Sequence, residues 1–265
     1  MGDVVYAAGE LEQHLRAIGV RAGETLLVQS SLRSVGPVDG GGETILKALL
    51  GALGPEGTLV VYTASPENSD TSRLALARTE GLGPAELRAH RATMPPYDPA
   101  TTPASPILGA LSELVRALPG AVRSAHPQTS FTAVGPKAEE VTAGHALDCH
   151  LGERSPAGAL YRSGARALLV GVPVWCCTAF HLAEYRLPGQ GTQRYGCVVR
   201  DERGLRQWVH FDAPKLEDAH FVRMGEALEH DIAGLIRGGF GDAGCFLLSV
   251  PEGVDACTAW LARRS

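Results

Sequence analysis

The sequence is short of the features that mark exported, membrane-bound and nucleic-acid-binding proteins. Its six cysteines include no Cys-x-x-Cys pair and no regular disulfide spacing, which favours a reducing cytoplasm. No apolar run approaches the ~18 residues that a membrane span needs, and the first residues lack the basic start of a secretory signal. The formal net charge is −5, with scattered lysines and arginines. We therefore expect neither a nucleic-acid nor a membrane partner.

The loop motifs of common nucleotide-binding enzymes are also missing. The segment 29–42, QSSLRSVGPVDGGG, lies between an expected strand and an expected helix, but it matches neither a P-loop nor the dinucleotide GxGxxG. Its serines, Arg33 and backbone N–H groups form a candidate anion cradle. An ordinary structural turn explains the same residues, so both interpretations stay open.

What the sequence does contain is an alternation of helix-like and strand-like segments. A helical period over 8–19 precedes a strand at 25–30, and a helix at 42–54 precedes a strand at 57–64. Such a β-loop-α-β unit is typical of a parallel sheet. Residues 165–172 predict another buried strand, and residues 194–212 predict a β-hairpin around a Glu-Arg-Gly turn. The 265 residues, 45% of them hydrophobic, can fill one sizeable core.

We therefore predict an α/β fold with a mostly parallel central sheet flanked by helices, plus a β-hairpin, in a single domain over residues 1–265. Ser105-Pro106 and Ser155-Pro156 each predict the start of a helix, with serine as the N-cap and proline at the first helical position. Residues 65–104 mix helical fragments with proline and glycine. A long irregular segment of this kind is either a lid-like insertion or a plain surface excursion.

Two residues three apart, His181 and Glu184, follow the strand expected at 165–172, where ligand sites of α/β sheets gather. On a helix they share a face, so the carboxylate can orient the imidazole as a general base. A core histidine beside a surface glutamate is the ordinary alternative. His126, in HPQTS, is a second candidate, and a turn histidine is again the alternative.

Cys176 and Cys177 precede the expected helix that carries His181. A helix N-terminus can activate a thiol, so a cysteine nucleophile is one interpretation. A zinc site with His181 and Glu184 is another, although the spacing of known closed sites is absent. Buried, inert thiols are the third interpretation.

Several longer segments, in order, resemble the aminoglycoside 3-N-acetyltransferase family, which uses acetyl-CoA without the GNAT fold. The matching segments are LLVQSSLRSVGPVDGGGETILKALLGALGPEGTLVVYT, YDPATTPASPILGALSELVRALPGAVRSAHPQTSF, SPAGALYRSGARALLVGV and HLAEY. The resemblance covers residues 8–265. It implies a non-GNAT antibiotic N-acetyltransferase fold, acetyl-CoA as cosubstrate without a metal, an aminoglycoside amine as partner, and a monomer or homodimer.

Carried over residue by residue, the resemblance makes His181 the general base for the amine, with Glu184 as an acidic group of the catalytic and substrate sites. It places His126, as a catalytic residue, and Ser130, as a cofactor contact, near the thioester. Asp212 falls near the acceptor, and Trp175, in a run that departs from the family pattern, is expected to line the acceptor site. The loop expected along the CoA pyrophosphate and pantetheine comprises Ser30, Ser31, Leu32, Arg33, Ser34, Val35 and Gly36.

The chain departs from the family pattern at two places. Position 29 is Gln where many members have His, and the run PVWCCTAF (173–180) replaces a more polar one. The apolar run points to an acceptor less cationic than a typical aminoglycoside, such as an amine from natural-product biosynthesis. A Cys-dependent acyltransferase or amidohydrolase, a zinc hydrolase and an antibiotic-sequestering protein are the rival functions.

Overall fold

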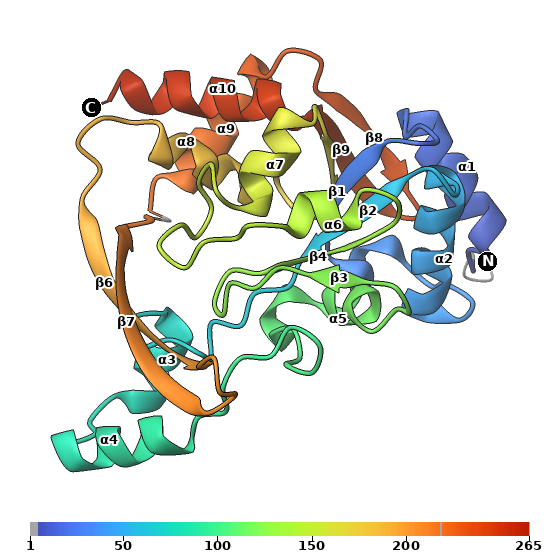
Figure 1. Ribbon diagram of the computed structural model, residues 1–265. Helices are drawn as coiled ribbons and strands as arrows, with labels where there is room; N and C mark the ends of the chain where they lie inside the picture. The colour runs from blue at the N-terminus through green and yellow to red at the C-terminus, as the bar shows by residue number, and fades with distance from the viewer. Residues whose placement is uncertain (1–4, 218, 265) are drawn as a thin grey trace.

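The computed structural model describes residues 5–217 and 219–264 and is built around a seven-stranded sheet (Figure 1). Its strand order is β3-β4-β2-β1-β5-β9-β8. The strands are β1 (Thr25–Ser30), β2 (Thr58–Tyr62), β3 (Val122–Arg123), β4 (Phe131–Val134), β5 (Arg166–Val170), β8 (Ile236–Phe240) and β9 (Ala243–Ser249). The α/β class and the strands expected from the apolar runs are confirmed.

The sheet is parallel only at its centre, which corrects the expectation of a mostly parallel sheet. Strand β1 pairs in parallel with β2 and β5, whereas the four outer pairings are antiparallel. For two of these four pairings, β8 with β9 and β3 with β4, the reason lies in the connections. Gly241 and Asp242 alone join β8 to β9, and residues 124–130 join β3 to β4. Connections this short join antiparallel neighbours, because a parallel pair needs a longer crossover.

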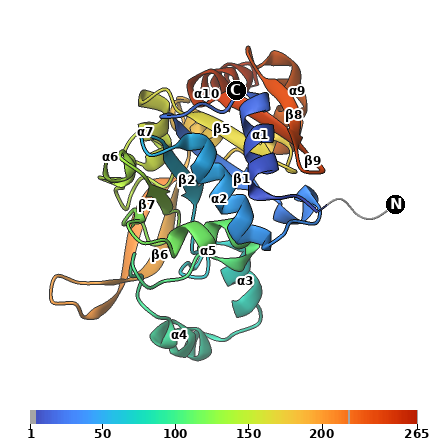
Figure 2. The same cartoon turned by 90° about the vertical axis from the view of Figure 1, so that its right-hand side faces the viewer.

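Both faces of the sheet are covered by helices, as the two views show (Figures 1 and 2). Alternate residues of β1 belong to different cores: Leu27 packs with one cluster, Leu26 and Val28 with the other. One face carries α1 (Ala8–Ile18), α2 (Gly41–Leu53) and α5 (Ala110–Arg116). The other carries α6 (Ala138–Thr142), α7 (Pro156–Arg162), α9 (Phe221–Asp231) and α10 (Val250–Ala262). Within the described ranges, no helix has the length and apolar character to span a membrane.

The two Ser-Pro helix starts have different outcomes. Ser155 caps α7 as predicted, because its hydroxyl accepts the Ala157 N–H at 3.2 Å. The prediction for Ser105 is wrong: Pro106–Leu108 is a single 3₁₀ turn, and α5 begins only after Gly109, whose φ is 82°. The Ser105 hydroxyl instead donates to the Glu67 carboxylate at 2.6 Å.

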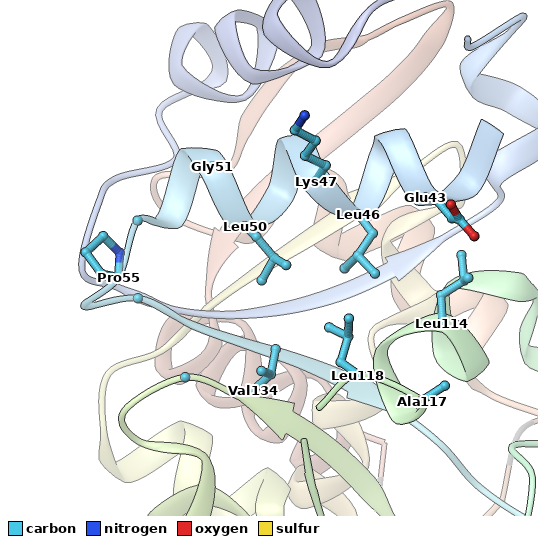
Figure 3. Close-up of a pocket in the computed structure, with 13 residues that line it drawn as sticks. Glu43, Leu46, Lys47, Leu50, Gly51, Pro55, Leu114, Ala117, Leu118 and Val134 are labelled. Carbon is cyan, nitrogen blue, oxygen red and sulfur yellow. The ribbon is translucent and has the colours of Figure 1, made fainter. Parts of the chain in front are cut away.

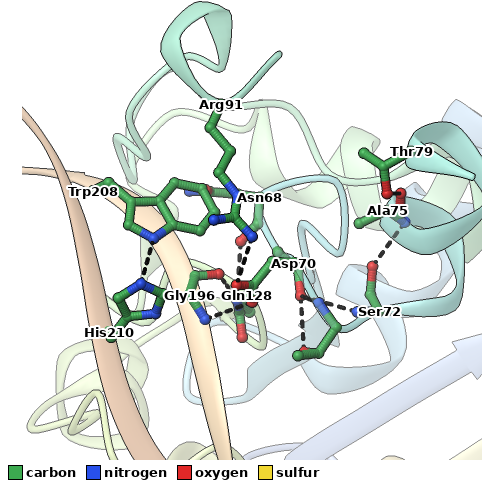
Figure 4. Close-up of polar contacts among 12 residues, drawn as sticks. Asn68, Asp70, Ser72, Ala75, Thr79, Arg91, Gln128, Gly196, Trp208 and His210 are labelled. Carbon is green, nitrogen blue, oxygen red and sulfur yellow. Dashed lines mark hydrogen bonds and ion pairs between the residues drawn. The ribbon is translucent and has the colours of Figure 1, made fainter. Parts of the chain in front are cut away.

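The predicted hairpin is present as β6 (Thr192–Arg200) and β7 (Arg206–Pro214), a separate two-stranded sheet. The segment 65–104 contains α3 (Arg73–Thr79) and α4 (Pro84–Thr93), and it is bound to this hairpin (Figure 4). The Asn68 amide donates to the Val198 carbonyl at 2.8 Å and accepts its N–H at 2.7 Å. Asp70 accepts the Gly196 N–H at 2.7 Å. A lid role for the segment stays a prediction.

Candidate active site

The carboxyl ends of the three parallel strands β1, β2 and β5 meet at one edge of the sheet, where α/β proteins bind ligands. A cleft of about 750 Å³ opens there. We call it the first cleft; its lining includes Gln29, Ser30, Ser112, Trp175, Cys176 and Val222.

A second cleft, of about 760 Å³, adjoins it under the hairpin. Its lining includes Ser69, Gln128, Thr129, His150, Tyr195 and Glu217. Residues common to both clefts are Tyr62, Arg73, Ile107, Leu108, His181 and Ala219. His181 therefore stands where two separate ligands can meet.

His181 and Glu184 form a pair, as the sequence predicted. The His181 Nδ1 lies 2.5 Å from the Glu184 Oε2. Glu184 is only 2% exposed, and its other oxygen accepts the Glu217 N–H at 2.9 Å. With both oxygens engaged behind the clefts, the carboxylate fixes the ring orientation of His181. Glu184 lines neither cleft, so the structure does not bring it into contact with an acceptor.

The segment that carries this pair is less regular than the predicted helix. It consists of the 3₁₀ turns Val174–Cys176 and Thr178–His181, followed by α8 (Leu182–Tyr185). Gln29 anchors it to the end of β1: its side-chain oxygen accepts the Thr178 N–H, and its amide donates to the Thr178 hydroxyl, both at 2.7 Å. The departure at position 29 thus supplies a two-point anchor for the turn before His181.

The loop after β1 faces the first cleft only in part. Ser30 lines it, and Ser34 donates to the Ser31 hydroxyl at 3.0 Å beside it. Val35 is fully buried in the core. Gly36 has a φ of 86°, and a Cβ there would lie 2.1 Å from the Asp242 carboxylate. Val35 and Gly36 therefore serve the structure of the turn and are not placed to bind an anion.

Two further residues of that loop, Leu32 and Arg33, line neither cleft. Leu32 packs against the core on the α2 side of the sheet, so its side chain is not directed at a ligand. Arg33 is exposed and lines neither cleft. A phosphate contact by Arg33 stays a prediction.

The structure does not support a catalytic role for His126. The side chain is 1% exposed, and its Nδ1 accepts the N–H groups of Gln128 and Thr129 at 3.1 and 3.2 Å. Its Nε2 donates to the Leu147 carbonyl at 3.1 Å. Burial, together with two neighbouring histidines, lowers the pKa of His126 well below its usual value. His126 is the turn histidine of the alternative interpretation.

Ser130 is likewise outside the clefts. It is fully buried, donates to the Thr63 carbonyl and accepts from the Arg123 guanidinium, both at 3.0 Å. Its hydroxyl secures the core side of the HPQTS loop rather than a cofactor.

The two expected acceptor residues have different positions. Trp175 lines the first cleft and packs against α9, where a Cβ on Gly225 would lie 2.5 Å from its own Cβ. Asp212 is exposed on β7 and lines neither cleft. The preceding residue, Phe211, turns inward to the rings of His126 and His150, and side chains alternate along a strand. Asp212 therefore faces away from the site.

The cysteines beside His181 are poorly suited to nucleophilic catalysis. Cys177 is fully buried, which raises its pKa to about 12. Cys176 lines the first cleft, and burial raises its pKa as well. A nucleophilic thiol needs a lowered pKa, so the interpretation as protonated, inert thiols fits best. Among the residues that the structure describes, no group of three or more His, Cys, Asp and Glu is arranged to hold a metal ion.

Sequence reasoning missed Tyr62 and Arg73, which line both clefts. Tyr62 could have been found from the sequence, because it is the last residue of a parallel strand and the carboxyl ends of such strands form the ligand-binding edge of the sheet. A larger hollow of about 970 Å³ lies elsewhere, between α2, α5 and the end of β4 (Figure 3). Its lining is mainly leucine and other apolar residues, with Glu43 and Lys47, and provides no pair comparable to His181 and Glu184.

The fold, the two clefts and the His-Glu pair form a candidate enzyme active site, and comparison with known proteins identifies the class. The family model described as aminoglycoside 3-N-acetyltransferase matches residues 27–262. The chain belongs to the aminoglycoside 3-N-acetyltransferase family.

Three relatives illustrate the similarity. The aminoglycoside N(3')-acetyltransferase-like protein YokD of Bacillus subtilis is 35% identical over 94% of this chain and 90% of its own length. Its crystal structure superposes with a TM-score of 0.91 over 97% and 94% of the two chains, at 33% identity. AAC-IIIb in a binary complex with CoASH has a TM-score of 0.84 at 29% identity over 98% of each chain. Sisomicin-bound AAC-VIa has a TM-score of 0.85 at 28% identity over 98% and 99%.

Proposed function

We propose that this protein transfers the acetyl group of acetyl-CoA to the 3-amino group of an aminoglycoside, directly and with His181 as general base. The observation that carries the proposal is the position of His181: it lines both clefts, and its Nδ1 is held by the buried Glu184. The complexes of relatives with CoASH and with sisomicin support the two ligands.

In this mechanism acetyl-CoA occupies the first cleft, which borders Ser30, and the amine occupies the second cleft, under the hairpin. The Nδ1–H of neutral His181 donates to Glu184, so Nε2 accepts a proton from the ammonium. The amine nitrogen then attacks the thioester carbon, and collapse of the tetrahedral intermediate breaks the C–S bond. His181 returns its proton to the leaving thiolate, and the second proton of the nitrogen goes to solvent.

The test is a thiol-release assay with acetyl-CoA and a panel of aminoglycosides, with the acetylated nitrogen located by NMR. We expect CoASH release that saturates with the aminoglycoside, and a product acetylated at the 3-amine. Release that is independent of the acceptor, or binding of the aminoglycoside without any release, would contradict the proposal. The second outcome would favour a sequestering protein.

A less cationic amine from natural-product biosynthesis is the second candidate. The described lining of the second cleft includes Arg73 and Lys215 beside Glu217, and Lys215 pairs with Glu217 at 2.8 Å. This mixture of signs attracts a polycation less than a row of carboxylates does. Simpler amines in the same panel test this candidate, which predicts a higher kcat/KM for them.

The cell compartment and assembly also belong to the proposal. All six cysteines are free thiols, as expected for a protein of the reducing cytoplasm. We therefore place the reaction in the cytoplasm; a monomer or homodimer stays the prediction made from the resemblance.

A further inference from the structure

The proposed reaction needs a hydrogen-bond donor for the thioester oxygen, which becomes negative when the amine attacks the carbon beside it. His181 accepts the proton of the amine, and Glu184 lines neither cleft. The donor is therefore expected among the other polar groups of the first cleft, within reach of the carbon that His181 serves.

Thr178 lies on the same side of its turn as His181. It is the first residue of the 3₁₀ turn Thr178–His181, and His181 is the last. Side chains three positions apart eclipse one another in a 3₁₀ turn, about 6 Å apart along its axis. Both residues line the first cleft. Thr178 is partly exposed, although its neighbours Cys177 and Ala179 are fully buried.

The hydrogen bonds of Gln29 determine which way the Thr178 hydroxyl can donate. The backbone N–H of Thr178 is a donor only, so its 2.7 Å bond identifies the partner atom as the Gln29 Oε1. The Gln29 Nε2 consequently donates to the Thr178 Oγ1, also at 2.7 Å. An amide NH₂ group does not accept hydrogen bonds, so the hydroxyl proton of Thr178 is directed away from Gln29.

Within the part of the chain that the structure describes, no acceptor takes the proton of the Thr178 hydroxyl. A hydroxyl that accepts from Gln29 and lacks an internal acceptor can donate to a ligand in the first cleft. The separation from His181 suits this role. Two hydrogen bonds of about 2.8 Å each, one to the nitrogen and one to the oxygen of the same tetrahedral carbon, span a distance of this order.

We propose that the Thr178 hydroxyl donates to the carbonyl oxygen of the acetyl group and stabilises the oxyanion of the tetrahedral intermediate, with Gln29 as the positioning residue that orients it. The inference rests on the proposed function. The O–H bond of Thr178 stays intact while the bond from nitrogen to carbon forms and the C–S bond breaks. Gln29, which departs from the family pattern, acts on the reaction through Thr178.

Thr178→Val tests the donor, because valine has the same shape without the hydroxyl and keeps the backbone N–H for Gln29. We expect kcat to fall on the order of 10²-fold, the usual cost of losing one oxyanion donor. The KM values of both substrates and the affinity for CoASH, which has no acetyl oxygen, should stay within about threefold. An unchanged kcat in folded Thr178→Val overturns the inference.

Two further threonine variants complete this test. Thr178→Ser restores a hydroxyl and should recover most of the lost rate; a serine variant as slow as Thr178→Val overturns the inference. Thr258→Val on α10 is the matched control, because its hydroxyl donates to the Val254 carbonyl and the residue lines neither cleft. Its kcat should equal that of the wild type.

Gln29→Glu separates orientation of the hydroxyl from anchoring of the turn. Glutamate keeps an acceptor for the Thr178 N–H, but its second oxygen accepts the hydroxyl proton and withdraws it from the cleft. The kcat should therefore fall about as far as in Thr178→Val, and the double variant should be no slower than Thr178→Val alone. A normal kcat in Gln29→Glu, or losses that multiply in the double variant, overturns the orienting role of Gln29.

If Thr178→Val does not fold, the wild-type enzyme decides. The infrared stretch of acetyl-CoA labelled with ¹³C at the carbonyl should move to lower frequency on binding than in water, and a stretch at or above the value in water overturns the inference. Absence of thiol release with every acceptor overturns the proposed function, and the inference with it. Normal wild-type turnover combined with an unaffected Thr178→Val overturns the inference alone.

Discussion

The histidines near the two clefts fall into two groups: His181 by itself, and a cluster of three. The two groups differ in the hydrogen-bond partners of their rings. His181 has a carboxylate partner and lines both clefts. His126, His145 and His150 form a second group, with ring centroids of His126 4.7 and 4.6 Å from those of the other two. Backbone groups bind the rings of His126 and His145.

The difference shows that burial alone does not make a histidine catalytic. In the second group, burial lowers the pKa of His145 to about 4 and of His150 to about 3, so these rings stay neutral and do not take up a second proton at physiological pH. In the proposed mechanism, the negative charge of Glu184 stabilises the imidazolium that proton transfer to His181 creates. In this proposal, the carboxylate partner of His181 and its place in both clefts distinguish it from the second group.

The largest effect is expected from His181→Ala. Without the base, kcat for thiol release should fall on the order of 10³-fold, a typical contribution of general base catalysis. Acetyl-CoA affinity, measured by calorimetry, should be largely retained, because only the proton acceptor is removed. Loss of CoA binding together with activity would assign His181 to the cofactor site instead.

Glu184→Gln should lower kcat on the order of 10²-fold, because the amide has one acceptor oxygen for the two donors, His181 Nδ1–H and Glu217 N–H, and has no charge to stabilise the imidazolium. The KM for the acceptor should be unchanged, since Glu184 lines neither cleft. Glu229→Gln on α9, an exchange remote from the pair, is the control. A raised acceptor KM with normal kcat would show that Glu184 binds substrate.

The second group predicts a loss of stability in acid. Its folded-state pKa values lie below the unfolded value of 6.5, so the unfolded state binds more protons between them. Stability is complete above about pH 6.5 and should decrease as the pH falls, by about 2 kcal/mol for each of His145 and His150 at pH 5. Urea unfolding at pH 7 and pH 5 measures the difference, and His145→Asn should reduce it. A pH-independent free energy of unfolding would contradict this account.

His126→Phe should affect stability rather than chemistry. The change leaves the N–H groups of Gln128 and Thr129 without their acceptor, at a cost of about 1–3 kcal/mol. His126→Asn is the matched control, because its side-chain oxygen can accept the same N–H groups as in an Asx turn. A large fall in kcat for folded His126→Asn would return His126 to the catalytic site.

The smallest effect is expected from the double variant Cys176→Ala, Cys177→Ala. Direct transfer uses no enzyme nucleophile, so kcat should stay within about twofold of the wild type. Cys245→Ala, a buried cysteine on β9, controls for the loss of a packed thiol. Loss of turnover with CoA binding intact would establish the cysteine mechanism.

Continuous apolar runs predicted the central strands well, because a strand that is buried on both faces has apolar residues at consecutive positions. The edge strand β8, IRGGF, is exposed for most of its length, and β3 has two residues, so neither has such a signal. Two of the four antiparallel outer pairings, β3 with β4 and β8 with β9, follow from short connections that the sequence did not reveal.

Within the site, the local pair His181 and Glu184 was predictable, since helical spacing places three-apart residues together. The anchor between Gln29 and Thr178 joins residues 149 positions apart, and no local pattern indicates it. Asp212 could have been excluded by strand alternation, because an inward Phe211 requires an outward neighbour. His126 could not, because its role depends on which backbone groups its ring meets.

The most direct test of the contrast between the two groups is the single-turnover rate of acetyl transfer in His181→Ala and His126→Asn, measured side by side. Each enzyme is loaded with acetyl-CoA and mixed with a saturating aminoglycoside. The account predicts a rate near that of the wild type for His126→Asn and one lower on the order of 10³-fold for His181→Ala. The reverse order, or two equal rates, would contradict it.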